Sequence, residues 1–298
     1  MTSNDPIVVV GSGLMGTGIA HAFISTGHPV TLVDQQPLAL TRARDTIAKI
    51  LSEGVRLGKS NEADAAAALG RLQCADSLGA APKNVLLVVE TATEKLDIKQ
   101  AIVREAESLF GADTVIATNT SALSITEIAA AAKSPQRVIG MHFFNPVHKM
   151  KLVEIVRGLE TSSATVARAQ AWSTAIGKTS IEVNESPGFT TSRISALLGN
   201  EAMYMLAEGV AKAEDIDTSM RMAFNHPMGP LELGDLTGWD TRLAVLKYLH
   251  QTLGEKFRPC PLIIKLVKAG RHGRKTGRGI YEYDETGAKV PNSGVRPF

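Results

Sequence analysis

Short apolar runs separated by glycine turns and helical patterns dominate the first half of the chain. The run 7–10 (IVVV) precedes the glycine-rich stretch GSGLMGTG, and apolar residues then recur at helical spacing from Ile19 to Phe23. A second run, PVTLV, ends at Asp34, and the continuous apolar run 84–90 (NVLLVVE) is typical of a strand buried on both faces of a parallel sheet. This alternation predicts an α/β domain of Rossmann type with a mostly parallel sheet.

Two long helical patterns follow the second strand, and further strands come after them. The apolar positions predict helices over 38–57 and 61–69, a pair longer than a simple crossover needs, which we expect to project from the sheet. The stretches 113–123 (DTVIATNTSAL) and 137–146 (RVIGMHFFNP) each predict a strand, and the second ends at His142. The run LVEIV that follows is also typical of a strand.

From about Ser186 the pattern changes to successive helices. Apolar residues recur at helical steps from Ile194 to Leu206. Further helices are predicted over 213–222, 229–236, 238–253 and 261–270. We therefore expect two domains, a Rossmann-type domain over 1–185 and an all-helical C-terminal domain over 186–298.

Two stretches of the helical region carry charged residues. MGPLELGD is predicted to end one helix and begin the next, so Glu232 and Asp235 are interpreted as structural. The segment 265–279 (KLVKAGRHGRKTGRG) is strongly basic, which usually marks a solvated surface, although its cations could also meet phosphates.

Composition excludes several classes of protein. The 298 residues carry a net charge of +2 with 21% charged residues, which argues against a nucleic-acid binder. Cys74 and Cys260 are the only cysteines, so neither a disulfide framework nor a metal site built from thiols is expected. The chain begins without the pattern of a signal peptide and contains no apolar run of membrane-spanning length. These features predict a cytoplasmic protein with no membrane partner.

The first glycine turn has the spacing of a dinucleotide site. Gly11 permits a sharp turn, Gly13 allows a pyrophosphate to approach the backbone, and Gly16 lets the helix pack on the strand. Asp34 lies 18 residues after Gly16, where its carboxylate can accept hydrogen bonds from ribose hydroxyls and would repel a 2′-phosphate. The pattern favours NAD over NADP; the alternative is an ordinary glycine-turned βαβ unit.

Polar side chains follow the later strands where each strand ends. Ser121 follows the strand of 113–123, His142 ends the next strand, and Glu154 lies twelve residues further on. The carboxyl ends of parallel strands are where ligands bind in such sheets. A histidine oriented by a carboxylate is an efficient base for removing a hydroxyl proton while hydride leaves to a cofactor. An alternative interpretation of His142 is a core histidine without a catalytic role.

The sequence also resembles the L-3-hydroxyacyl-CoA dehydrogenases, of the bacterial 3-hydroxybutyryl-CoA dehydrogenase type. The resemblance spans nearly the whole chain. It is carried by VVGSGLMGTGIA, LVD, VVETATEKLDIK, NTSALSITEIA, GMHFFNPVHKMKLVEIV, SPGF with Arg193, HPMGPLELGDLTGWD and GRKTGRGIYEY. It implies an NAD-dependent enzyme with an acyl-CoA substrate, and a homodimer formed through the C-terminal domain.

The resemblance also implies roles for individual residues. His142 would be the base, Glu154 its partner, and Ser121 a contact of substrate and cofactor. The residues expected to bind NAD are Gly11, Ser12, Gly13, Leu14, Met15, Gly16, Asp34, Glu94, Lys99, Ser121, Asn145 and Lys275. The helical pair after Asp34 would help to cover the CoA. Arg56 and Lys59 could meet a phosphate there, although solvated surface charge is the preferred interpretation of each.

One position departs from the family pattern. The family usually has an asparagine before the arginine of the PGF-x-x-N-R stretch, where it helps to polarise the substrate carbonyl, and this chain has Ser192 there. Asn200 cannot replace it, because eight residues of helix span about 12 Å. The hydroxyl of Ser192 can still donate one hydrogen bond, so we expect a catalytic contact that is tolerated, with weakened turnover or an altered substrate range as the alternative.

Two other functions remain open from the sequence. A related dehydrogenase could act on a free 3-hydroxy acid or sugar acid, which would need an Arg or Lys clamp for a carboxylate. A catalytically weak or silent NAD-binding protein could also use this fold. The presence of His142, Glu154 and Ser121 argues against the silent protein.

Overall fold

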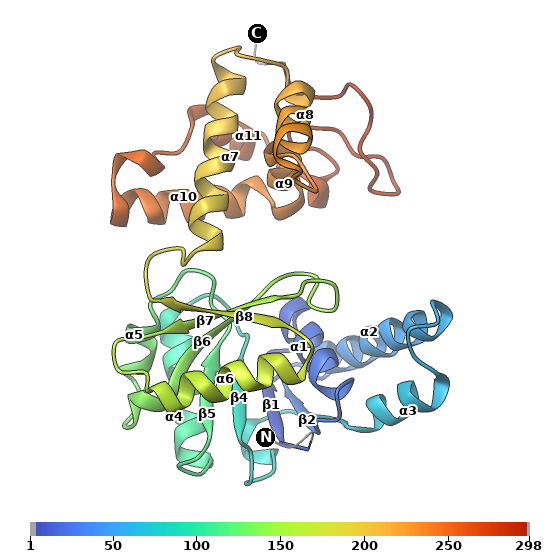
Figure 1. The fold of residues 1–298 in the computed structure, drawn as a ribbon, viewed down its shortest axis with the longest axis vertical. Helices are drawn as coiled ribbons and strands as arrows, with labels where there is room; N and C mark the ends of the chain where they lie inside the picture. The colour runs from blue at the N-terminus through green and yellow to red at the C-terminus, as the bar shows by residue number, and fades with distance from the viewer. Residues whose placement is uncertain (1–3, 297–298) are drawn as a thin grey trace. The chain divides into compact units, whose positions relative to one another are not determined.

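The computed structural model describes residues 4–296 in two compact units. One unit runs to Ser186 and the other begins at Pro187, one residue after the boundary expected from the sequence. The first unit is built on a sheet and the second is helical (Figure 1). Each unit is described by itself.

The first unit contains one sheet of eight strands in the order β3-β2-β1-β4-β5-β6-β7-β8. All neighbouring strands are parallel except β6 and β7, which are antiparallel. The predicted α/β domain with a mostly parallel sheet is therefore confirmed. The strands are β1 Ile7–Val10, β2 Val30–Val33, β3 Leu72–Ala75, β4 Leu87–Glu90, β5 Val115–Thr118, β6 Val138–Phe143, β7 Leu152–Arg157 and β8 Thr179–Asn184.

Helices cover both faces of this sheet (Figure 1). In β1, Ile7 and Val9 pack on one face with α1, α2 and α6, whereas Val8 and Val10 pack on the other face with α4 and α5. The central strands alternate between two apolar layers, which explains why they are continuous apolar runs. The helices of this unit are α1 Leu14–Ile24, α2 Pro37–Arg56, α3 Glu62–Gly70, α4 Leu96–Leu109, α5 Ile125–Ala129 and α6 Ser163–Ala175.

The helices α2 and α3 form the projecting pair that the sequence predicts (Figure 1). The helix α2 packs on the core through Leu40, Ala43, Ile47 and Leu51, and most of its other positions are exposed. The side chain of Asn61 accepts a hydrogen bond from the backbone N–H of Asp64 and so caps α3.

The second unit is all-helical up to residue 268, and the chain then folds back as turns and isolated bridges. Its helices are α7 Thr191–Ala207, α8 Ala213–Phe224, α9 Pro230–Thr237, α10 Trp239–Leu253 and α11 Pro261–Lys268. Trp239, Leu246 and Phe257 lie at the centre of its core.

Two buried carboxylates join the returning chain to these helices. Asp217 accepts hydrogen bonds from the backbone of α9 and from the hydroxyl of Tyr281. Asp235 accepts from the indole N–H of Trp239, the hydroxyl of Tyr283 and two backbone N–H groups of the returning segment. Burial raises the pKa of both carboxyls, although the hydrogen bonds oppose the shift. The structural role predicted for Asp235 agrees with these contacts.

Some local expectations from the sequence differ from the structure. The helix α8 already ends at Phe224, so the stretch MGPLELGD enters and forms α9 and does not end α8. The strands β3 and β8 were not expected, because both are short and largely exposed and therefore lack a continuous apolar run. Among residues 4–296, no helix is long and apolar enough to cross a membrane.

Candidate active site

The glycine turn between β1 and α1 forms a cradle without side chains. Gly11 has a φ of +96°, and a Cβ on Gly16 would lie 1.8 Å from the carbonyl oxygen of Gly11. Gly13 is the N-cap of α1 and has no side-chain cap, and a Cβ there would meet nothing within 4 Å. The first N–H groups of α1 can therefore meet the pyrophosphate of a dinucleotide. The Leu14 side chain is exposed, whereas Met15 is partly buried and packs against the core.

Asp34 follows β2 and faces this turn. Its Oδ2 accepts hydrogen bonds from the backbone N–H of Ser12 at 2.8 Å and from its hydroxyl at 2.7 Å, and its Oδ1 accepts from the N–H of Gln36 at 2.9 Å. Burial acts to raise the pKa of Asp34, but these hydrogen bonds outweigh it and hold the pKa below the ordinary value. The ionised carboxylate retains acceptor capacity for a ribose hydroxyl, so the residues fit an NAD ribose.

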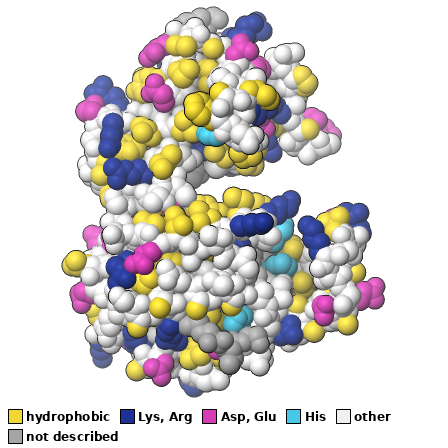
Figure 2. Space-filling view, in the orientation of Figure 1, with side chains coloured by type: hydrophobic (Ala, Val, Ile, Leu, Met, Phe, Trp, Pro, Cys, Tyr) yellow, Lys and Arg dark blue, Asp and Glu magenta, His cyan; other side chains and the backbone are white. Residues whose placement is uncertain are grey.

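A cavity of about 670 Å³ lies beside the glycine turn. Its walls come from the turn, from one face of α2 and from the loop after β6; they include Ser12, Gly13, Arg42, Asn145 and His148. Figure 2 shows histidine and cationic side chains on the surface between the body of this unit and the projecting pair. Asn145 therefore lies at the wall of a cavity that also contains the dinucleotide turn.

His142 and Glu154 are brought together by the antiparallel pairing of β6 and β7. The two residues are direct partners in the strand register, so their side chains leave the same face of the sheet. The Nδ1 of His142 lies 2.7 Å from Oε2 of Glu154, and the two residues are 7% and 0% exposed. The twelve-residue spacing thus spans the end of β6, the connecting loop and the start of β7, which together return the chain to this register.

The hydrogen bond bears on the histidine tautomer. An ionised carboxylate only accepts, so pairing with Glu154 favours the tautomer of a neutral imidazole that carries its proton on Nδ1 and a lone pair on Nε2. The ring also contacts Phe144, with centroids 4.6 Å apart. A neutral imidazole held in this way can remove a proton through Nε2, and Glu154 can stabilise the imidazolium that results.

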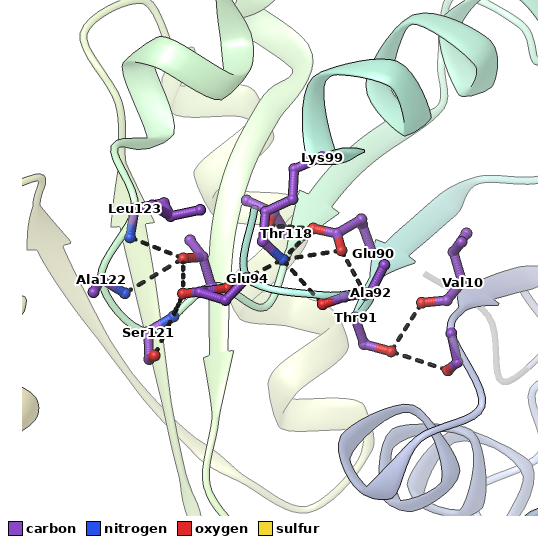
Figure 3. A network of polar contacts seen from close by, with 12 residues as sticks. Val10, Glu90, Thr91, Ala92, Glu94, Lys99, Thr118, Ser121, Ala122 and Leu123 are labelled. Atoms are coloured by element: carbon purple, nitrogen blue, oxygen red, sulfur yellow. Dashed lines mark hydrogen bonds and ion pairs between the residues drawn. The ribbon is translucent and has the colours of Figure 1, made fainter. Parts of the chain in front are cut away.

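Ser121 lies in the loop after β5, and Glu94 organises that loop. The Oε1 of Glu94 accepts from the Thr120 hydroxyl at 2.5 Å, from the Ser121 backbone N–H at 3.0 Å and from the Ser121 hydroxyl at 3.4 Å. Figure 3 shows Glu94 beside Ser121 in this loop. Asn119 accepts a hydrogen bond at 2.8 Å from the backbone N–H of Phe143, the residue after His142. The loop that carries Ser121 is therefore fastened to the strand that carries the histidine.

Lys99 and Glu90 form a buried ion pair beneath this loop (Figure 3). The side chains are 1% and 0% exposed, and their charged atoms are 2.9 Å apart. The sequence places Glu90 at the carboxyl end of a strand, where ligands bind, but its ion pair with Lys99 was not predicted. The signal that could have revealed it is a carboxylate at the end of an otherwise apolar strand, because an ionised group buried there needs a partner.

Two expected site residues belong to the helical unit. Ser192 lies in the first turn of α7. Lys275 lies in the basic segment after α11, and its Nζ is 2.6 Å from Oδ1 of Asp240. Asn200 is buried and bonds to the backbone at Arg258 and Cys260, so its amide has a structural function. No group of three or more His, Cys, Asp or Glu residues within 4–296 could hold a metal ion.

Comparison with known proteins identifies the family. Residues 6–186 match the model of the 3-hydroxyacyl-CoA dehydrogenase NAD-binding domain, and residues 188–283 match that of the 3-hydroxyacyl-CoA dehydrogenase C-terminal domain. A probable 3-hydroxybutyryl-CoA dehydrogenase of Bacillus subtilis is 43% identical over 94% of this chain and 97% of its own length. A 3-hydroxybutyryl-CoA dehydrogenase of Clostridioides difficile is 42% identical over 94% and 99% of the two chains.

A solved structure gives the same result. The (S)-3-hydroxybutyryl-CoA dehydrogenase PaaH1 of Ralstonia eutropha superposes with a TM-score of 0.91 at 43% identity, covering 95% of this chain and all of the other. The fold, the dinucleotide turn and the histidine–glutamate pair agree with these matches. The chain belongs to the 3-hydroxyacyl-CoA dehydrogenase family and is an NAD-dependent oxidoreductase.

Proposed function

We propose that this dehydrogenase interconverts a short-chain L-3-hydroxyacyl-CoA, such as 3-hydroxybutyryl-CoA, and the corresponding 3-oxoacyl-CoA. The names of the relatives from Bacillus subtilis and Clostridioides difficile support the chain length. The observation that carries the proposal is the buried pair of His142 and Glu154, held in direct register at 2.7 Å.

In the proposed reaction, His142 takes the proton of the substrate hydroxyl on Nε2 while the C3 hydrogen leaves as hydride. The nicotinamide ring of bound NAD supplies the hydride acceptor. Glu154 keeps the proton on Nδ1 before the reaction and stabilises the imidazolium afterwards. In the reverse direction the protonated His142 donates to the oxygen of the 3-oxo group. Ser121 would bond to the same oxygen and so orient it toward the imidazole.

The cofactor contacts form the second part of the proposal. The turn from Gly11 to Gly16 would hold the pyrophosphate, and Asp34 would hold the adenosine ribose. Glu94, Asn145 and Lys275 would lie along the rest of the cofactor. Ser192 would donate a hydrogen bond near the substrate carbonyl. The helical unit would complete the substrate site and form a homodimer, and the enzyme would work in the cytoplasm.

Turnover of acetoacetyl-CoA, followed by the loss of NADH absorbance, tests the proposal. We expect fast turnover with acetoacetyl-CoA and NADH, and little with free acetoacetate or with NADPH. His142→Gln should abolish turnover and leave the affinity for NADH nearly unchanged. Efficient reduction of free acetoacetate would indicate a hydroxy-acid dehydrogenase, and loss of NADH binding by the variant would show that His142 is structural.

A further inference from the structure

A group of imidazole and ammonium side chains lies on the flank of α1. The imidazoles of His21 on α1 and His148 in the loop after β6 meet edge to face, with ring centroids 6.2 Å apart. His148 is exposed and lines the cavity beside the glycine turn. His21 comes two turns after Leu14, the first residue of α1, which is about 10 Å along the helix. The group therefore lies apart from the helix N-terminus that would receive the pyrophosphate of NAD.

The loop that carries His148 is fixed to the body of the sheet unit. The ammonium of Lys178, just before β8, donates hydrogen bonds to the carbonyl oxygens of Val147 and Met150, both at 2.6 Å. On α1, Gly18 leaves room for this loop, because a Cβ on Gly18 would lie 2.8 Å from the side chain of Val147. His148 is thus presented to the cavity on a backbone that is held from two sides.

Positive charges face both imidazoles. Lys178 acts on His21 and on His148, and Lys149 and Lys59 also act on His148. Burial and these charges together lower the pKa of both imidazoles below the ordinary value. Both rings are therefore mostly neutral near pH 7, although cations surround them.

The cavity beside His148 lacks a compensating negative charge. Arg42 on α2 lines the same cavity. Glu53 on α2 faces Lys59, but its carboxylate binds Arg56 at 2.5 Å. Among residues 4–296, no carboxylate contributes to the pKa shift of either imidazole. Such a wall repels metal ions and protons and attracts anions, and phosphate is the anion that cationic side chains bind most often in ligand sites.

We propose that His148, together with Lys149 and Lys59, binds a phosphate group of the acyl-CoA substrate and takes up a proton as it does so. The inference rests on the proposed function, because CoA brings phosphates beyond those of NAD, which the glycine turn would hold. A phosphate beside His148 favours the imidazolium, which donates a charge-assisted hydrogen bond. The pKa of His148 is thus low in the free protein and raised in the complex. Affinity for CoA should therefore rise as the pH falls from about 8 to about 6.5, where the ligand still carries a phosphate dianion.

Calorimetric titration of the full chain with CoA, in buffers of different ionisation enthalpy, measures the protons that binding takes up. His148→Gln keeps a polar side chain of similar size and removes the titration. We expect this variant to take up fewer protons than the unsubstituted protein. Because His148 is exposed, the variant should bind CoA only up to about fivefold more weakly at about pH 6.5, with little change at about pH 8. Comparing the two proteins cancels the titration of the phosphate itself.

Two further variants separate the proton from the charge. Lys149→Gln removes a neighbouring cation that does not titrate in this range, so it should weaken CoA binding by a similar factor at both pH values and retain a proton uptake. Lys83→Gln removes an exposed cation from the loop before β4, at the amino-terminal edge of the sheet, and should leave CoA binding unchanged.

Dephospho-CoA identifies the phosphate that His148 contacts. If the difference between His148→Gln and the unsubstituted protein disappears with this ligand, the contact is to the 3′-phosphate. If the difference persists, the contact is to the pyrophosphate. Either result supports a phosphate of CoA as the partner of His148.

Two results would overturn the inference. One is equal CoA affinity and equal proton uptake in His148→Gln and in the unsubstituted protein. The other is weaker NADH binding by His148→Gln with unchanged CoA binding, which would show that the phosphate beside His148 belongs to the cofactor. Both differ from a failure of the proposed function, in which the unsubstituted protein would not turn over acetoacetyl-CoA with NADH.

Discussion

Replacing Glu154 by glutamine tests the central pair with a change of one charge. The side chains of Glu and Gln have nearly the same shape, and Glu154 is fully buried on β7, so the packing is kept. What changes is the partner of Nδ1 of His142, which now faces a neutral amide across 2.7 Å. The amide can also donate to Nδ1, which would move the ring proton to Nε2 and remove the lone pair needed for a base.

The size of the effect follows from the charge that is lost. As His142 takes a proton, an imidazolium forms with its charge centre about 4 Å from the carboxylate. At an effective dielectric constant of about 20, that attraction amounts to about 4 kcal/mol. Losing it from the transition state lowers kcat by about 10³-fold. Glu154→Asp keeps the charge on a shorter side chain and should recover part of this loss.

Steady-state reduction of acetoacetyl-CoA, together with NADH titration, measures this prediction. Glu154→Gln should lower kcat while the NADH dissociation constant stays the same. Glu182→Gln on the neighbouring strand β8 is a matched control, because Glu182 pairs with Arg157 at the surface. Activity of Glu154→Gln within a few-fold of the unsubstituted protein would refute the reasoning, since His142 would then work without its carboxylate.

Three further changes probe other parts of the molecule. Asp34→Ala should remove a hydrogen bond between the charged carboxylate and the cofactor ribose, and so weaken NADH binding by about 10- to 100-fold. It should also reduce the preference for NADH over NADPH. An unchanged preference would contradict the predicted contact between Asp34 and the ribose. Ser192→Asn should leave kcat the same or raise it by up to about tenfold, and a large loss would show that the hydroxyl has a role of its own. Burial, together with His148 and Lys178, lowers the pKa of His21 to about 4 from 6.5. The unfolded chain therefore binds more protons than the folded one between these values, and acidification through this range should cost up to about 3 kcal/mol of the free energy of unfolding, measured in urea at several pH values. His21→Gln should reduce this loss, and an equal loss in the variant would contradict the assignment.

Local patterns were sufficient to predict the elements that surround the site. Each of these elements is marked by a pattern only a few residues long: the apolar runs predict β1 and β4, and the glycine spacing predicts the turn from Gly11 to Gly16. The structure contains all three. The pairing of His142 with Glu154 was also open to prediction, because both lie on strands joined by one loop.

Contacts between distant parts of the chain were not predictable in the same way. Glu94 meets the loop of Ser121 across 27 residues, and no periodicity marks such a contact. The strand β8 has one buried position among six, so it forms because β7 offers an edge and not because of its own pattern. The roles of Ser192 and Lys275 remain predictions.

The two buried carboxylates of the helical unit also bear on the order in which the chain folds during synthesis. Every strand and helix of the sheet unit is complete by Ser186, so that unit can close while the rest is still being made. Asp217 and Asp235 lie on α8 and α9, whereas the tyrosines that donate hydrogen bonds to them, Tyr281 and Tyr283, come much later in the sequence. Until those tyrosines leave the ribosome, closing the helical core would bury under-bonded carboxylates, and a nascent chain stalled at residue 270 should hold a folded sheet unit beside helices open to proteolysis.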